Sequence, residues 1–239
     1  MGAARELNAG ALRSSGARRS MPWWWHLLVA VLVVALVQAV AVKLYAVPSG
    51  SMERTLAVGD RVLADRIAYA VGEPERGEVV VFTARGAWAT DAPPSRGVLR
   101  DALVWLGGSV GIGPGTDYTL VKRVIGLPGE TVACCDAEGR VTVDDAPLDE
   151  PYVFEDHAFE AGARDCETDV RSSRCFPPVL VPEGSYLVLG DHRSASADSV
   201  IGCRGAPPSA TGCARLVERD DVVGRVFQIV FPFTRWNGV

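Results

Sequence analysis

An apolar stretch near the N-terminus, residues 23–47, constrains this chain more than any other feature, because only three polar residues interrupt it. A bilayer-spanning helix needs roughly 20 apolar residues, so the stretch predicts a transmembrane anchor over residues 23–46. The alternative is a secretory signal peptide, for which Ala39-Val40-Ala41 offers a small-x-small cleavage site. The stretch exceeds the apolar core of about 7–15 residues that is typical of signal peptides, which favours the anchor.

The residues that flank this stretch predict the topology. Three tryptophans at its start suit the membrane interface, and the arginines before it predict a cytoplasmic N-terminus. Residues 1–22 are then a cytoplasmic tail, for which a composition rich in Ala, Ser, Gly and Arg predicts disorder. Residues 47–239 would form an extracytoplasmic domain, so we expect a single-pass protein of the plasma membrane.

The charge distribution excludes one class of partner. The formal net charge is −5, and the first 22 residues carry four arginines and one glutamate, or +3, so the rest of the chain carries −8. An acidic folded domain argues against nucleic acid as a partner, because phosphate binding needs a basic surface.

Short apolar runs bounded by Gly and Pro follow the predicted anchor and predict a mostly-β domain. The last of these runs is apolar on both faces, which is typical of a strand inside a sheet. Residues 84–117 interrupt the pattern as an irregular, variable insert. The predicted strands are 59–66, 76–82, 118–125, 131–133, 140–143, 185–189 and 222–231, with the fourth and fifth forming a hairpin.

All six cysteines follow the apolar stretch, and an even number in an oxidising compartment predicts disulfides. Cys166 with Cys175, and Cys203 with Cys213, would each close a short loop. The adjacent cysteines 134–135 are not expected to bridge each other, since neighbouring Cα atoms are about 3.8 Å apart and disulfides prefer about 4.4–6.8 Å. Zinc binding is the alternative, although the chain has no Cys-x-x-Cys pair.

The chemistry is expected at the turn after the apolar stretch, Val47-Pro48-Ser49-Gly50-Ser51-Met52. A serine nucleophile needs a partner that takes its proton, and the chain has only two lysines. Lys43 lies within the apolar stretch, where its amine is expected to reach the headgroups. Lys122 lies between apolar residues, and because burial lowers a lysine pKa, its neutral amine could serve as the general base for Ser51.

Two alternatives compete with this pair. His192 directly follows Asp191, and a Ser51–His192–Asp triad would perform the same proton transfer. The other alternative is a non-catalytic, membrane-anchored β module that binds exported peptides, in which Ser51 and Lys122 would be incidental.

Five blocks follow the predicted anchor in this order: Pro48–Met52, Arg76–Phe82, Lys122–Glu130, Gly190–Ser199 and Val223–Arg225. They resemble the signature blocks of bacterial type I signal peptidases (leader peptidases), which are serine proteases with a Ser/Lys dyad. The likeness covers most of residues 47–231 and leaves out the insert and the cysteine-bearing loops. The resemblance implies an antiparallel β-sheet catalytic domain behind one N-terminal transmembrane helix.

The resemblance also implies a role for individual residues. Ser51 would be the nucleophile and Lys122 the general base and later general acid. The Ser51 N–H and the Ser49 hydroxyl would form the oxyanion hole. Ser196 would orient the Lys122 amine by a hydrogen bond.

The remaining implied roles are structural. Asp198 would lie in a salt-bridge network that includes Arg123, Met52 would help to shape the substrate cleft, and Asp191 would support the site.

Three positions depart from the family pattern. Arg54 stands where proline is usual, and His192 stands where asparagine is usual. Val200 replaces an arginine of the salt-bridge network, which would leave Asp198 to rely on Arg123 alone.

The implied reaction is the cleavage of signal peptides from exported preproteins after a small-x-small (Ala-x-Ala) motif. Shallow apolar pockets would admit alanine and exclude larger side chains, and the substrate would pair as a β-strand along an exposed edge. The expected partners are signal peptides, the lipid bilayer and the secretion translocon, and no metal or cofactor is needed.

Overall fold

The computed structural model describes residues 22–91 and 118–239. The predicted tail 1–22, apart from its last residue, and most of the insert 84–117 lie outside the described residues. The chain divides into two compact units, residues 1–34 and 35–239.

The predicted anchor 23–46 is divided between a helix and a strand. The helix α1 (Trp23–Val40) is apolar throughout most of its length, and β1 (Val42–Ala46) follows it and pairs antiparallel with β2 (Arg61–Asp65). Among the helices of the described ranges, none is long and apolar enough to qualify as a membrane span. The prediction of one anchor segment over residues 23–46 is therefore wrong at its C-terminal end, because the backbone of residues 42–46 pairs with β2.

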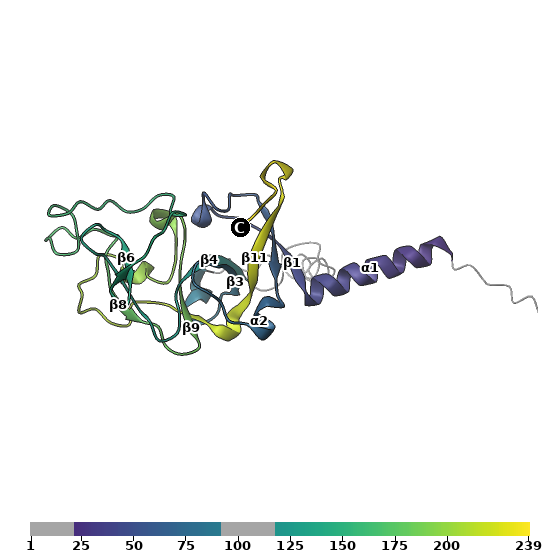
Figure 1. The fold of residues 1–239 in the computed structure, drawn as a ribbon, viewed down its shortest axis with the longest axis horizontal. Coiled ribbons are helices and arrows are strands. Elements are labelled where there is room, and N and C mark those ends of the chain that lie inside the picture. The colour runs from purple at the N-terminus through teal and green to yellow at the C-terminus, as the bar shows by residue number, and fades with distance from the viewer. Residues whose placement is uncertain (1–21, 92–117) are drawn as a thin grey trace, which may run out of the picture. The chain divides into compact units, whose positions relative to one another are not determined.

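The larger sheet has the strand order β1-β2-β11-β3-β4-β9-β10, with β12 paired to β11 outside this path. All of its described strand pairs are antiparallel, which confirms the mostly-β prediction (Figure 1). Its further strands are β3 (Val79–Thr83), β4 (Thr119–Gly126), β9 (Ser185–Leu189), β10 (Val217–Glu218), β11 (Val222–Phe231) and β12 (Asn237–Gly238).

The middle of this sheet is buried on both faces. Along β3, Val79 and Val81 pack into one apolar cluster, whereas Val80 and Phe82 pack into another. Successive side chains of a strand point to opposite faces, so the uninterrupted apolar run in β3 fills two cores at once. The long strand β11 lies between β2 and β3, as its apolar composition predicted.

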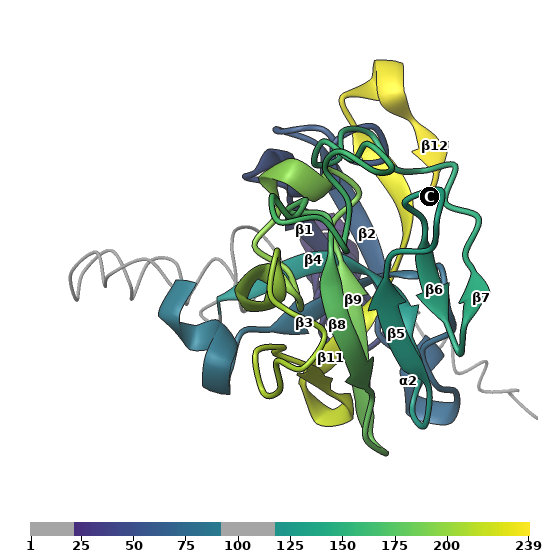
Figure 2. The ribbon, with the colours of Figure 1, turned by 90° about the vertical axis from the view of Figure 1, so that its left-hand side faces the viewer.

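The smaller sheet lies at one end of unit 35–239, away from β1 (Figure 1), and faces the viewer in Figure 2. Its hairpin confirms the one predicted from sequence, but its edge strand β8 was not predicted, because Pro177 and Pro178 argue against a strand. Proline is tolerated at a sheet edge, where its missing N–H breaks no pairing. The strand order is β7 (Ala146–Pro147), β6 (Val141–Val143), β5 (Thr131–Cys134) and β8 (Phe176–Leu180).

Short helices connect the strands. One of them, η2, begins the predicted insert, and there Trp88 is buried and its indole N–H donates to Leu216 O at 2.9 Å. The short helices are α2 (Ala68–Val71) and the 3-10 helices η1 (Gly50–Met52), η2 (Gly86–Asp91), η3 (Arg193–Ala195), η4 (Ile201–Cys203), η5 (Arg219–Asp221) and η6 (Phe233–Arg235).

Each cysteine is in a disulfide. The predicted pairs Cys166–Cys175 and Cys203–Cys213 are both present. The expectation that residues 134–135 do not bridge each other is wrong: they form a disulfide across a cis peptide bond, with Cα atoms 2.9 Å apart. The expectation assumed the trans separation of about 3.8 Å.

Candidate active site

The turn that carries Ser51 is held by buried side chains. Ser51 lies in η1, and Met52 and Leu56 just after it are 1% and 0% exposed within the apolar cluster of β1, β2, β3 and β11. Two backbone bonds close the loop, from Val47 N to Asp60 O and from Gly59 N to Val47 O, each 2.9 Å long. The serine is thus fixed to the sheet by its own neighbours in sequence.

Two hydrogen-bond donors lie on the same turn as the Ser51 hydroxyl. Ser49 precedes η1 in an extended conformation, is exposed, and makes no capping bond with its side chain. The N–H of Ser51 belongs to the first turn of η1, where N–H groups have no acceptor within the helix. The two groups that the resemblance implied for an oxyanion hole thus lie on one turn, and their role stays a prediction.

Lys122 reaches Ser51 from the larger sheet. It lies in β4, where it is paired in register with Val80 of β3, and it is only 3% exposed. Its Nζ is 2.8 Å from Ser51 Oγ and also donates to Val121 O at 3.2 Å. Residues 71 positions apart in the chain are thus brought within hydrogen-bond distance, which is the geometry that proton transfer between them requires.

The loop after β9 closes over the serine turn. The N–H of His192 donates to Ser51 O at 3.1 Å. A Cβ atom on Gly190 would lie 2.6 Å from Ser51 O and 2.2 Å from Ser196 Oγ, so only glycine allows this close approach. Ser196 is buried beside Gly190, and its hydroxyl has no hydrogen-bond partner in the described part of the chain. The predicted bond from Ser196 to the Lys122 amine is thus not formed in this structure.

Arg123, the neighbour of Lys122, binds Asp191 and not Asp198 as was expected. Its Nε and Nη2 donate to the two carboxylate oxygens of Asp191 at 2.8 and 2.6 Å. Thr55 joins this pair, donating to Asp191 Oδ2 at 2.5 Å and accepting from Arg123 Nη2 at 3.1 Å. The correction follows from the register of the sheet, because β4 and β9 place Arg123 opposite Leu189, two residues before Asp191.

The aromatic ring of Tyr152 covers this ion pair. The guanidinium carbon of Arg123 lies 4.0 Å from the centre of the Tyr152 ring. Burial raises the pKa of Tyr152, and the negative charge of Glu150 raises it further. A neutral phenol ring thus lies over the Arg123 guanidinium.

Replacing Arg123 by methionine is expected to lower the free energy of unfolding by about 3 kcal/mol, because it leaves the buried Asp191 carboxylate unpaired. Urea denaturation of the full-length protein measures this. Arg140→Met is the matched control, since the Arg140 side chain is 50% exposed where it pairs with Asp136 and Glu138, and its loss should change stability by less than about 1 kcal/mol. Equal losses in the two variants would contradict a structural role for the Arg123–Asp191 pair.

Two of the three departures from the family pattern, Arg54 and Val200, are accommodated by the local structure. Arg54 has a φ of 78°, which a proline ring cannot adopt, and it donates to Val153 O at 3.1 Å. Val200 is fully buried in an apolar cluster. The cation that pairs with Asp198 comes from Arg204, whose Nη2 is 3.0 Å from Asp198 Oδ2. The expectation that Asp198 relies on Arg123 is therefore wrong.

His192 does not form the alternative triad in this structure. Its Nδ1 lies 3.1 Å from Glu53 Oε2 and its Nε2 lies 3.4 Å from Glu155 Oε2. Both ring nitrogens thus face carboxylates, and in the described residues the hydroxyl of Ser51 is bonded to Lys122.

Thr55, Glu53 and Arg204 were not singled out from the sequence. Thr55 and Glu53 follow the serine within four positions, so their proximity to the site was a usable signal. For Arg204 the only signal in the sequence was its position next to Cys203, and its partner Asp198 could not be identified without the fold.

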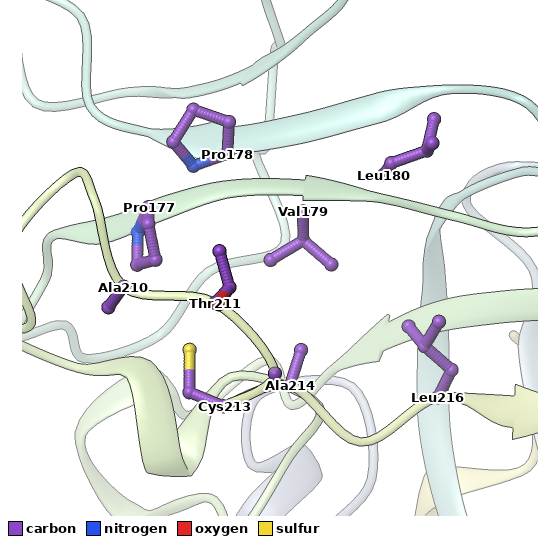
Figure 3. Close-up of a pocket in the computed structure, with 10 residues that line it drawn as sticks. Pro177, Pro178, Val179, Leu180, Ala210, Thr211, Cys213, Ala214 and Leu216 are labelled. Atoms are coloured by element: carbon purple, nitrogen blue, oxygen red, sulfur yellow. The ribbon is translucent and has the colours of Figure 1, made fainter.

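An apolar cavity of about 340 Å³ lies elsewhere, between β8 and residues 210–216 (Figure 3). Pro177, Leu180, Cys213 and Leu216 are among the residues that line it, and none of the candidate site residues does. The site around Ser51 is therefore separate from this cavity.

Comparison with known proteins identifies the family of this chain. The family model described as "Signal peptidase, peptidase S26" matches residues 20–231. The chain is 33% identical to a probable signal peptidase I of Mycobacterium leprae, over 96% of this chain and 83% of that protein. It is 34% identical to signal peptidase I of Mycobacterium tuberculosis, over 89% and 72%, respectively. It is 32% identical to a probable signal peptidase I-2 of Synechocystis, over 88% and 75%.

Proposed function

The chain belongs to the signal peptidase I family, peptidase S26, and is a serine endopeptidase, and we propose that it cleaves signal peptides from exported preproteins with Ser51 and Lys122. The observation that carries the assignment of residues is the 2.8 Å separation between Ser51 Oγ and Lys122 Nζ. A hydroxyl and an amine at this distance form a nucleophile and base, and the low exposure of Lys122 keeps water from competing for the amine.

In the first half of the reaction the Lys122 amine accepts the proton of Ser51 Oγ as that oxygen attacks the scissile carbonyl. The negative charge that develops on the carbonyl oxygen is stabilised by the Ser51 N–H and the Ser49 hydroxyl. The C–N bond then breaks, and the Lys122 ammonium gives its proton to the leaving amine of the mature protein. The signal peptide remains as an ester on Ser51.

The second half repeats the proton transfers with water. Lys122, again neutral, accepts a proton from a water molecule that attacks the ester, and the ester bond to Ser51 breaks. The proton returns from Lys122 to Ser51 Oγ, and the signal peptide leaves with a free carboxylate. The same base thus serves both halves, as microscopic reversibility requires.

The surrounding residues have supporting roles in this proposal. Asp191 and Asp198 fix the loop after β9, and Met52 lines the floor of the substrate cleft from its buried position in η1. Ser196 lies against Gly190 at the edge of the serine turn. In the reacting enzyme the Lys122 amine would donate an N–H to the Ser196 hydroxyl oxygen, which leaves its lone pair for the Ser51 proton.

The apolar N-terminal segment would attach the protein to the plasma membrane. The arginines before Trp23 favour a cytoplasmic N-terminus, and the catalytic domain would then face the extracytoplasmic side, where three disulfides are stable. The substrates would be preproteins delivered by the translocon, whose cleavage sites emerge on that same side.

Cleavage after a small-x-small motif is tested with the substrate. Replacing the alanine at position −1 of a preprotein by phenylalanine is expected to lower kcat/KM at least about a hundredfold, because a pocket shaped for a methyl group cannot admit a ring. Cleavage is followed by gel mobility and by the mass of the product.

The control places the same phenylalanine at position −2, the x of the motif, where cleavage should stay within about threefold of the parent substrate. Equal cleavage of the −1 and −2 variants would contradict the proposed specificity. A peptide-binding module without activity would leave every substrate intact, including the parent.

A further inference from the structure

Arg204 brings a positive charge to the catalytic domain from a segment outside the five signature blocks. Its Nη2 lies 3.0 Å from Asp198 Oδ2, and the two side chains are 8% and 0% exposed. Burial lowers the pKa of the neighbouring His157, and the positive charge of Arg204 lowers it further. The imidazole therefore stays neutral at neutral pH, and Arg204 is the cation that pairs with the Asp198 carboxylate.

A short series of contacts connects this ion pair to the dyad. The same Asp198 oxygen that binds Arg204 also accepts the N–H of Gly190 at 3.4 Å. Gly190 in turn is packed so closely on Ser196 and on the carbonyl of Ser51 that a methyl group would not fit. A displacement of Asp198 would therefore shift Gly190, and Gly190 would in turn shift the turn that carries Ser51.

The ion pair is a poor candidate for a purely stabilising element. A buried pair roughly balances its desolvation cost, and an apolar pair of the same volume is often as stable. In the described residues, Arg204 Nε is moreover buried with no hydrogen-bond partner, which is a further cost. A buried guanidinium with an unsatisfied donor, linked to Ser51 through only two intervening residues, favours a role in positioning.

The Cys203–Cys213 disulfide fixes the backbone that carries Arg204. Cys203 is fully buried at the end of η4, with its Cα 5.1 Å from that of Cys213. Gly202 lies against the Cys213 carbonyl, where a Cβ would be 2.8 Å from the oxygen. Gly205 N donates to Cys175 O at 2.7 Å. The residues on both sides of Arg204 are thus fixed in place. Cys213, the other cysteine of the disulfide, borders the cavity beside β8 (Figure 3).

We infer that Arg204, held by the Cys203–Cys213 disulfide, is a positioning residue for the Ser51–Lys122 dyad and acts through Asp198 and Gly190. The inference rests on the proposed function of the dyad. By this inference, the disulfide loop 203–213, which lies outside the signature blocks, affects the rate of peptide-bond cleavage.

Steady-state kinetics of the full-length protein with a preprotein substrate test this role. Arg204→Gln is expected to lower kcat about tenfold and to leave KM within about twofold, because substitutions along networks of this kind change coupling by about two- to thirtyfold. Arg204→Lys, which keeps the charge but loses the planar fork, should recover part of the loss. A merely structural arginine would lower the melting temperature without this split between kcat and KM.

The control is Arg219→Gln. Arg219 also bonds a carboxylate and backbone carbonyls, those of Glu73, Tyr69 and Gly72, and it has no contact with the loop after β9 among its described bonds. This variant is expected to keep the parent kcat, whatever its effect on stability.

The disulfide is tested by a cycle of variants. The double variant Cys203→Ser/Cys213→Ser should lower kcat without changing KM. Adding Arg204→Gln to it should give no larger loss than Arg204→Gln alone, since both changes break one series of contacts. If the kcat losses of the disulfide variant and of Arg204→Gln multiply in the combined variant, the disulfide acts by a separate route, and its part in the inference is overturned.

An Arg204→Gln variant with the parent kcat, in a preparation where the parent cleaves and Ser51→Ala does not, would overturn the role of Arg204 and leave the proposed function standing. If the parent protein itself cleaves no preprotein, the proposed function fails, and the inference fails with it.

Discussion

A Ser51→Ala variant is expected to cleave preprotein at a kcat at least about four orders of magnitude below that of the parent, because removing a serine nucleophile removes the covalent route altogether. Only the oxyanion donors and substrate binding would remain. The fold should be intact, since Ser51 is half-buried and the Lys122 amine keeps its bond to Val121 O. Single-turnover cleavage of a radiolabelled preprotein, with enzyme in excess, has the range to measure such a loss.

The matched control is Ser173→Ala, which removes an exposed hydroxyl that is not among the predicted site residues. It should cleave at the parent rate. Substantial activity in Ser51→Ala, with product cut at the same bond, would assign the nucleophile to another residue.

Replacing Lys122 by methionine is expected to lower kcat by about three orders of magnitude, which is within the range that general acid–base catalysis contributes. Methionine has a similar length and suits a site that is 3% exposed, so the loss would report the amine and not a packing defect. The comparison of rates should be made at several pH values, because a serine without its base becomes more reactive as hydroxide increases.

The chain provides its own control, since Lys43 is the only other lysine. Its amine lies 5.5 Å from the centre of the Tyr45 ring in β1, and Lys43→Met should retain the parent kcat. The competing triad makes the opposite forecast: full activity in Lys122→Met and loss in His192→Ala.

The strands of the domain could be predicted because their pattern is local. The apolar runs around Val80 and Leu187, each entered through a turn, are buried strands for the reason that the sequence suggests. Among the strands of five or more residues, β8 and β1 were missed, because prolines argue against the first and the second continues the apolar stretch of the helix before it. Both depend on partners that are distant in sequence, so pairing overrides the local signal.

The proximity of Ser51 and Lys122 could be predicted from the scarcity of lysine and from the family resemblance together. With two lysines in the chain, the choice of Lys122 needed little structural information, and the structure places it against Ser51. The ion pairs were harder, because arginine is abundant and its long side chain reaches many carboxylates. Arg123 and Arg204 were each assigned to their partner only when the register of β4 and β9 and the course of the 203–213 loop were known.

The proposed mechanism requires that the signal peptide acylate Ser51. The most direct measurement is the intact mass and peptide map of the full-length protein after acid quench of its reaction with a thioester of a signal-peptide C-terminal segment. The expected result is a single adduct of the acyl mass on the peptide that contains Ser51, absent from Ser51→Ala. An adduct on another residue, or rapid product formation by Ser51→Ala, would contradict it.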